Sequence, residues 1–254
     1  MAVESQEPKD ALNKAFRKVK PNRADFETFK AQLSALLAGV KAGESEEFHK
    51  NLIAEFLKKN YYDAHFINTK ERNDLVIHEG KTSDTLVAVI LETKKPDNKS
   101  EMPTVTDLNR KALHELVLYY LRERVTNKNL NVKHLIVTNT YEWFIFDASI
   151  FEKTFVENKA FVRQYEDFAA ERLPSHKTEF FYNDMAKPFI ARLTEPFPFT
   201  YVDLRDYQGD DTGEKSSSPC TSCSPPNTCS NSPLPTTATR STRPFTPNSC
   251  ISSA

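Results

Sequence analysis

An apolar run at residues 86–91 is followed at once by Glu92, Thr93, Lys94 and Lys95. Both alternating sets of positions in the run are apolar, so a strand formed by it would be covered on both faces. Such a strand belongs in the interior of a sheet. A charged ending is unusual for a strand that only packs. The segment therefore predicts a central β-strand whose charged side chains gather where the strand leaves the sheet.

Helical patterns precede this strand. Apolar residues recur at helical spacing over residues 25–41 and 46–60. Ser45 is expected to cap the second helix, whose first turn carries Glu46 and Glu47, as the helix dipole favours. We therefore expect two helices before the first strands.

The remaining elements follow from shorter patterns. Strands are expected at residues 65–68, 73–78, 85–94, 134–139 and 142–147, with a hairpin connection at 79–84. One helix is expected from Thr106 or Asp107 to about residue 124, and two more over residues 149–172 and 179–193. Pro196 and Pro198 are then expected to break the chain. This order predicts an α/β sandwich around one mixed β-sheet flanked by helices.

The chain divides into four expected parts. They are an N-terminal helical extension (1–43), a core (44–148), a helical extension or linker (149–210) and a low-complexity tail (211–254). The tail is rich in Ser, Pro and Thr and is expected to be disordered. It holds all four cysteines, but the uneven spacing and missing histidines argue against a zinc site.

The charge balance limits the classes of partner. The chain has 34 Lys and Arg against 35 Asp and Glu, so it lacks the basic excess typical of nucleic-acid-binding proteins. Any DNA contact must come from a local patch or another module. No segment approaches the ~18–20 apolar residues of a membrane span, and the N-terminus lacks a signal-peptide core. We therefore expect a cytoplasmic protein with no membrane partner.

The charges at the strand ends indicate a metal centre. Glu92 and Lys94 are two apart in a strand and point to the same face. Pairing across the hairpin would place Asp74 next to Glu92, and two such carboxylates repel unless a cation lies between them. Mg²⁺ typically uses one or two protein carboxylates, and Lys94 would then orient or deprotonate the attacking water or stabilise developing charge. The alternative is a plain surface ion pair, as most such spacings are.

Other candidates carry weaker signals. Glu47 can supply a third carboxylate, or it is only a dipole-favoured first-turn acid. Glu115 and Tyr119 are i, i+4 neighbours, which we interpret as a solvated Glu and a packed Tyr. Trp143 is expected in the sheet core. Four basic residues near the proposed centre are either phosphate contacts or solvated charges: Lys70, Arg72, Lys95 and Lys99.

Together these features resemble the PD-(D/E)xK nuclease fold. More closely, Ile-Asn-Thr-Lys-Glu-Arg-Asn-Asp-Leu-Val-Ile-His (67–78) and Glu-Thr-Lys-Lys-Pro-Asp-Asn-Lys-Ser-Glu-Met (92–102) resemble the N-terminal nuclease region of bacterial type IIG-like restriction–modification fusion enzymes. His-Glu-Leu-Val-Leu-Tyr-Tyr-Leu-Arg-Glu (114–123) and Asn-Thr-Tyr-Glu-Trp-Phe-Ile-Phe-Asp (139–147) do so too. The resemblance covers about residues 8–210. It departs from the usual pattern at Asn73, where a proline commonly stands.

The resemblance implies a Mg²⁺-dependent DNA endonuclease domain in which Mn²⁺ can substitute. Asp74 and Glu92 would be the metal ligands and Lys94 the catalytic lysine. In that family an adenine-type DNA methyltransferase and a target-recognition part come later on the same chain, but this sequence has no Asn-Pro-Pro-Tyr motif or glycine-rich motif for S-adenosylmethionine. Double-stranded DNA is the expected partner, with a second nuclease copy or a separate methylase or specificity protein left open. The alternatives are a catalytically silent fragment that binds only DNA or a partner protein, and a gene remnant.

The tail also suggests a frameshift. Its possible codons, read from the third base, permit a charged amphipathic sequence that resembles the segment C-terminal to the nuclease region in the family. We interpret this as a frameshift near residues 214–218 that truncates the protein.

Overall fold

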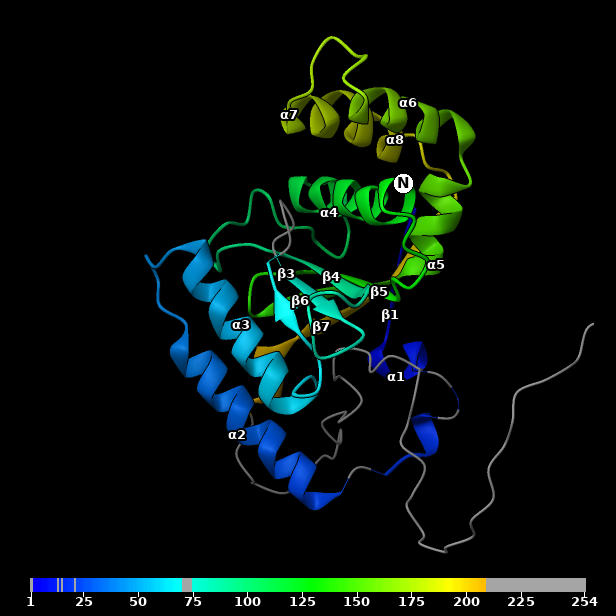
Figure 1. The fold of residues 1–254 in the computed structure, drawn as a ribbon. Helices are drawn as coiled ribbons and strands as arrows, with labels where there is room; N and C mark the ends of the chain where they lie inside the picture. The colour runs from blue at the N-terminus through cyan, green and yellow to red at the C-terminus, as the bar shows by residue number, and fades with distance from the viewer. Residues whose placement is uncertain (1, 13, 15, 21, 70–74, 209–254) are drawn as a thin grey trace, which may run out of the picture.

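Seven strands form one mixed sheet in the order β1-β7-β6-β5-β4-β3-β2 (Figure 1). The computed structural model describes residues 2–12, 14, 16–20, 22–69 and 75–208. The strands are β1 (Ala2–Gln6), β2 (Ile67–Asn68), β3 (Leu75–His78), β4 (Val87–Thr93), β5 (His134–Thr138), β6 (Glu142–Asp147) and β7 (Pro196–Asp203). The pairs β1–β7 and β4–β5 are parallel, and the other neighbours are antiparallel. The predicted mixed sheet flanked by helices is confirmed.

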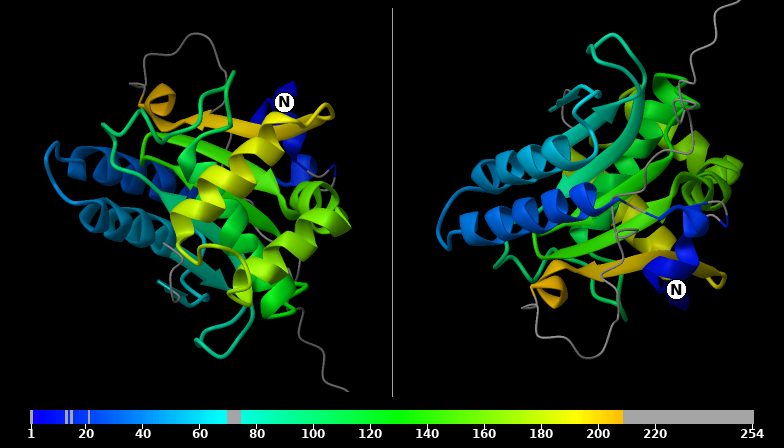
Figure 2. Two further views of the ribbon diagram at one scale, coloured as in Figure 1. Left: turned by 90° about the horizontal axis from the view of Figure 1, so that it is seen from above. Right: turned by 90° about the horizontal axis from the view of Figure 1, so that it is seen from below.

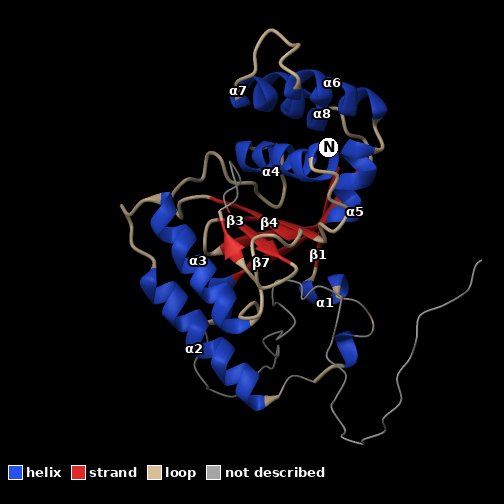
Figure 3. Cartoon of the chain, in the orientation of Figure 1, coloured by secondary structure: helices blue, strands red, loops and turns tan. Residues whose placement is uncertain are grey.

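Helices cover both faces of the sheet (Figures 2 and 3). On one face lie α2 (Arg23–Gly39) and α3 (Glu46–Asn60). On the other lies α4 (Lys111–Leu121), and α6 (Lys159–Ala169), α7 (Thr178–Phe180) and α8 (Lys187–Ala191) stack above it (Figure 1). The short elements are α1 (Pro8–Ala11), α5 (Ala148–Phe151), the 3₁₀ turns η1 (Phe16–Lys18) and η5 (Leu204–Tyr207), and the π-helical turns η2 (Arg122–Thr126), η3 (Glu152–Val156) and η4 (Phe181–Ala186).

Strand β4 is the central strand that its sequence predicts. All seven of its residues are buried, and it pairs with β3 on one side and β5 on the other. Its alternate residues enter different cores: Ile90 packs in the α4 layer, whereas Leu91 packs in the layer of α2 and α3. Because residues two apart share a face, Glu92 and Lys94 are directed toward α4.

Local sequence sets the start of α3 as predicted, but not that of α4. The Ser45 hydroxyl accepts a hydrogen bond from the Phe48 N–H at 3.0 Å, which caps α3. The expected cap of α4 at Thr106 or Asp107 is wrong. Asp107 instead belongs to a turn in which its N–H donates to the Thr104 carbonyl at 3.1 Å, so α4 begins only at Lys111.

The expectation that Pro196 and Pro198 break the chain is also wrong, because both lie in β7. Proline lacks an N–H and is tolerated where one edge of a strand has no partner. The proline half of β7 pairs only with β1, through residues 196–200, whereas β6 pairs with residues 200–203. The sheet therefore takes β1 and β7 from segments outside the predicted core, residues 44–148.

Within the described residues, no helix combines the length and apolar character needed to cross a membrane.

We predict that His134 makes folding stability depend on pH. Burial lowers the pKa of this half-buried histidine to about 4, with Asp147 opposing and Lys133 reinforcing the shift. The unfolded histidine has a pKa of ~6.5, so protonation favours unfolding and stability falls as the pH drops from ~6.5 toward 4. His134→Gln should remove about 1–2 kcal/mol of this loss, measured by urea unfolding at several pH values.

Exposed His176 supplies the matched control. His176→Gln should keep the wild-type pH dependence. A residual dependence is expected in His134→Gln, because burial also lowers the pKa of His114 to about 4. An unchanged slope in His134→Gln would show that this ring does not contribute.

Candidate functional site

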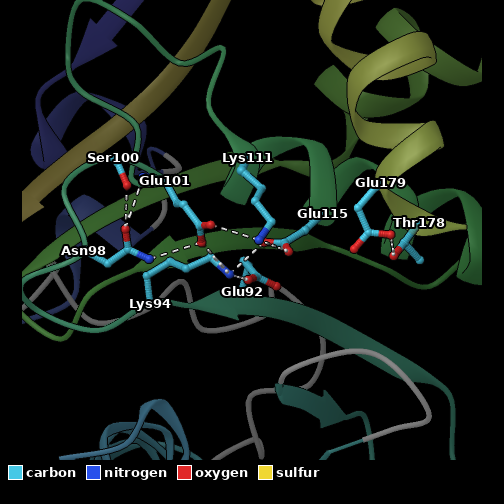
Figure 4. Close-up of polar contacts among 9 residues, drawn as sticks. All are labelled: Glu92, Lys94, Asn98, Ser100, Glu101, Lys111, Glu115, Thr178 and Glu179. Carbon is cyan, nitrogen blue, oxygen red and sulfur yellow. Dashed lines mark hydrogen bonds and ion pairs between the residues drawn. The ribbon is translucent and has the colours of Figure 1, made fainter.

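A buried lysine lies between two buried glutamates where β4 leaves the sheet (Figure 4). The Lys94 Nζ atom is 2.5 Å from Glu92 Oε1 and 2.7 Å from Glu115 Oε2. The exposed fractions are only 1% for Glu92, 4% for Lys94 and 8% for Glu115. Charges buried to this degree require compensation. The two carboxylates and the ammonium therefore compensate one another's charge.

The sheet and α4 fix these side chains in place. The backbone N–H of Lys94 donates to the Thr138 carbonyl at 2.8 Å, which extends the parallel pairing of β4 and β5 past Thr93. Glu115 lies on the buried face of α4, above the strand end. The groups thus sit on regular elements, which hold side chains more rigidly than loops do.

Two more charged residues connect the buried groups to the surface. Glu101 Oε2 lies 3.8 Å from Lys94 Nζ, and Glu101 Oε1 lies 2.9 Å from Lys111 Nζ. The Lys111 ammonium is also 3.8 Å from Glu115 Oε1. We call Glu92, Lys94, Glu101, Lys111 and Glu115 the Lys94 cluster. Its charges alternate in sign from the strand end to the exposed side chain of Lys111.

The carboxylates keep Lys94 protonated. Burial alone would lower the pKa of Lys94, but the negative charges of Glu92 and Glu115 outweigh it and raise the pKa above its ordinary range. Burial likewise opposes ionisation of Glu101, yet its hydrogen bond from Lys111 and the charge of Lys94 lower its pKa. In this state Lys94 is a cation and a donor and has no free lone pair to act as a base.

Of the predicted site residues, the structure brings Glu92 and Lys94 together. Asp74 lies outside the described residues. The strand pairing next to Asp74 in the sequence is present, because Leu75 lies opposite Leu91 in the β3–β4 hairpin. The metal-ligand role of Asp74 stays a prediction.

Glu47 is placed apart from this cluster by the described contacts. It is an exposed first-turn residue of α3, and its Oε2 lies 2.6 Å from Lys50 Nζ. Helix α3 covers the sheet face opposite α4. The role of Glu47 as a third ligand therefore stays a prediction that no described contact supports.

Glu115 was the residue that sequence reasoning misjudged. The expectation of a solvated Glu115 is wrong, because its side chain is buried against Lys94. The expectation of a packed Tyr119 is confirmed at 6% exposure, and so is Trp143 in the core at 3%. The sequence signal for Glu115 was an acid inside a largely apolar helical segment, between His114 and Leu116.

Tyr182 of η4 was missed altogether. Burial raises its pKa to about 12, and the charges of Glu115 and Glu92 add to this. Its phenol therefore lies within electrostatic range of the cluster, and the helical layer above α4 helps to enclose the site. A tyrosine in a helical pattern gives no sequence signal for this.

The donor set is compatible with Mg²⁺ but does not by itself form a complete cage. Among the described residues, no group of three or more His, Cys, Asp or Glu side chains could hold a metal ion. Mg²⁺ usually takes only one or two protein carboxylates and completes its shell with water and phosphate. Glu92 and Glu115 both reach one ammonium, so one cation can lie between them. A divalent ion would compete with Lys94 for these oxygens.

Comparison with known proteins places the chain in a family. The family model described as a domain of unknown function (DUF7149) matches residues 6–221. The chain belongs to the DUF7149 family. No curated protein and no solved structure matches it. The DUF7149 region contains the whole Lys94 cluster and all the strands except the first residues of β1.

We predict that a divalent ion can replace the Lys94 ammonium. Lys94→Met removes the charge but keeps the length of the side chain, which leaves Glu92 and Glu115 buried without their cation. Breaking such a buried set typically costs about 3–5 kcal/mol. Millimolar-range Mg²⁺, Mn²⁺ or Ca²⁺ should restore much of this loss in Lys94→Met and stabilise the wild type far less, as measured by thermal unfolding with and without metal.

Lys111→Met is the matched control, because Lys111 is exposed and its ion pairs are worth little. It should lower the stability by at most ~1 kcal/mol and respond to metal as the wild type does. If metal leaves the melting temperature of Lys94→Met unchanged, these carboxylates do not form a metal site.

Proposed function

We propose that this DUF7149 chain is a Mg²⁺-dependent DNA endonuclease domain of the PD-(D/E)xK type. The observation that carries the proposal is the meeting of Glu92 and Lys94 at the end of a fully buried central strand, where Glu115 of the covering helix joins them. A carboxylate and an ammonium fixed side by side on a rigid strand suit phosphodiester hydrolysis.

The order of elements supports this proposal. Helix α3 precedes the antiparallel strands β2, β3 and β4, and α4 then leads to β5, which is parallel to β4. The family resemblance implies this same succession. Asp74 directly precedes Leu75, and Glu92 directly follows its partner Leu91. We propose Asp74 and Glu92 as the metal ligands on this basis.

Each residue has a distinct proposed task. Bound Mg²⁺ would supply a Lewis acid and a water of lowered pKa. Lys94 would orient or deprotonate the attacking water, or stabilise the negative charge that develops on the phosphate. Glu115 would position the Lys94 ammonium, which it contacts at 2.7 Å.

The resemblance extends the proposal to the biological setting. The domain would be the nuclease part of a restriction–modification enzyme acting on double-stranded DNA, with Mn²⁺ able to substitute for Mg²⁺. A second copy, or a separate methylase or specificity protein, would be its protein partner. The sequence has no motif for S-adenosylmethionine and no recognisable target-reading element, so methylation and target choice would come from another part.

A second candidate function is a catalytically silent domain that only binds DNA or a partner protein. One observation favours it: Lys94 already compensates Glu92 and Glu115, as in a structural ion cluster. In that case the charges would secure the strand end against α4 and would need no metal.

Plasmid cleavage separates the two functions. We expect the wild type to nick supercoiled DNA in Mg²⁺ or Mn²⁺. Glu92→Gln and Lys94→Ala should each lower the rate by about 10²–10³-fold, the usual effect of removing one electrostatic contributor. The measurement is the initial rate of conversion to open-circular DNA by gel electrophoresis.

Glu195→Gln is the control, because Glu195 is exposed and pairs with exposed Lys153. It should cleave like the wild type. Nicking that survives both site substitutions would refute the assigned centre. Binding of DNA without cleavage in either metal would favour the silent domain.

A further inference from the structure

The segment directly after Lys94 is a tight turn, residues 95–101. The Asn98 N–H donates to the Lys95 carbonyl at 3.0 Å, and the Lys99 N–H donates to the Asp97 carbonyl at 2.9 Å. This turn leads directly away from the buried strand end. Figure 4 shows that two of its side chains, Asn98 and Glu101, lie beside Lys94.

The side chain of Asn98 braces the turn and fastens it to the cluster. Its Oδ1 accepts hydrogen bonds from the Glu101 N–H at 3.3 Å and the Ser100 hydroxyl at 3.0 Å. Its Nδ2 donates to Glu101 Oε2 at 3.1 Å. The same Glu101 carboxylate contacts Lys94 and Lys111. Asn98 thus couples the path of the turn to the charged centre.

The cationic side chains around the site differ in whether they already pair with a carboxylate. Lys94 and Lys111 contact carboxylates of the cluster, and Arg110 Nε lies 2.9 Å from Asp107 Oδ2. For Lys95 and Lys99, the described part of the chain offers no ion pair within reach. Lys99 is exposed and Lys95 is half-buried. Within the described part of the chain, these two ammonium groups are thus not engaged by a carboxylate.

The local net charge around the centre makes Lys95 and Lys99 important for binding an anion. Around the centre, the acids of the cluster and Asp97 offset the lysines of the cluster together with Lys95 and Lys99. The chain as a whole is also nearly neutral, so no broad positive field attracts a polyanion. Cations that are not already paired with a carboxylate are the stronger candidates to hold a phosphate here, and a divalent ion at Glu92 would add to them.

We propose that the turn of residues 95–101 binds the phosphodiester backbone of a nucleic acid, with Lys95 and Lys99 contacting phosphates and Asn98 as a positioning residue. This inference rests on the proposed function, because it assigns the substrate-binding element of the same site. The hydrogen-bonded turn fixes the backbone from which both lysines extend, one and five residues after Lys94, which would help to align the strand to be cut.

The test measures binding without cleavage. A fluorescently labelled DNA duplex is titrated with the full chain in Ca²⁺ and in EDTA, and anisotropy is followed over a range of salt concentrations. Lys95→Ala and Lys99→Ala should each weaken binding by about 3–10-fold and reduce the slope of log K against log salt by about 1, as loss of one phosphate contact does. Thermal unfolding checks that each variant is folded.

Lys81→Ala is the matched control, because Lys81 is an exposed lysine in the hairpin at the opposite end of β4. It should bind like the wild type. Equal losses for Lys81→Ala and Lys99→Ala would overturn the proposal, and so would wild-type affinity in both turn variants or no binding by the wild type.

A double-mutant cycle tests the role of Asn98. If Asn98 acts by placing Lys99, then Lys99→Ala should have little further effect on binding in the Asn98→Ala background. Fully additive losses would overturn the positioning role. Turn-specific binding by a wild type that never cleaves DNA would uphold this inference while refuting the nuclease, so the two failures are distinguishable.

Discussion

The burial of the Lys94 ammonium between Glu92 and Glu115 is the interaction on which the rest of the site depends. Removing charges from water costs several kcal/mol per ion, and the attraction between them repays this only when the geometry is good. Apolar residues of similar volume in place of a buried ion pair are often neutral or stabilising. Stability alone is therefore a weak explanation for a buried cluster of this kind.

The placement of this cluster follows from the sheet. Parallel pairing with β5 extends to the Lys94 backbone, and the alternation of β4 sends Glu92 and Lys94 toward the layer that contains α4. The apolar faces of β4 and α4 bring Glu115 over the strand end. The charged groups are thus positioned by hydrophobic burial around them, and their own attraction only completes the arrangement.

Sequence patterns predict the parts of this fold whose signals are local. The apolar run of β4 and the Ser45 cap of α3 each depend on neighbouring residues, and the structure confirms them. Strand β7 was missed because prolines such as Pro196 and Pro198 normally argue against a central strand. They are tolerated here because β1 and β6 pair with different halves of β7. Glu115 was misjudged because its partner is 21 residues away along the chain, and pairing at that separation leaves no periodic signal.

A structural ion cluster and a metal centre require different behaviour from the cation that lies between the carboxylates. A structural cluster is complete when the charges compensate one another, and Lys94 with its carboxylates approaches that state. A metal centre needs a cation that can leave or shift, and it needs somewhere for that cation to go. Glu101 lies 3.8 Å from Lys94 Nζ and is already ionised by its contact with Lys111. Its Oε2 also accepts a hydrogen bond from Asn98 Nδ2 at 3.1 Å, so both oxygens of Glu101 already have partners. These contacts suit a structural cluster as well as the surroundings of a metal ion. The exchange of the cation at Glu92 is therefore the property that distinguishes the two roles.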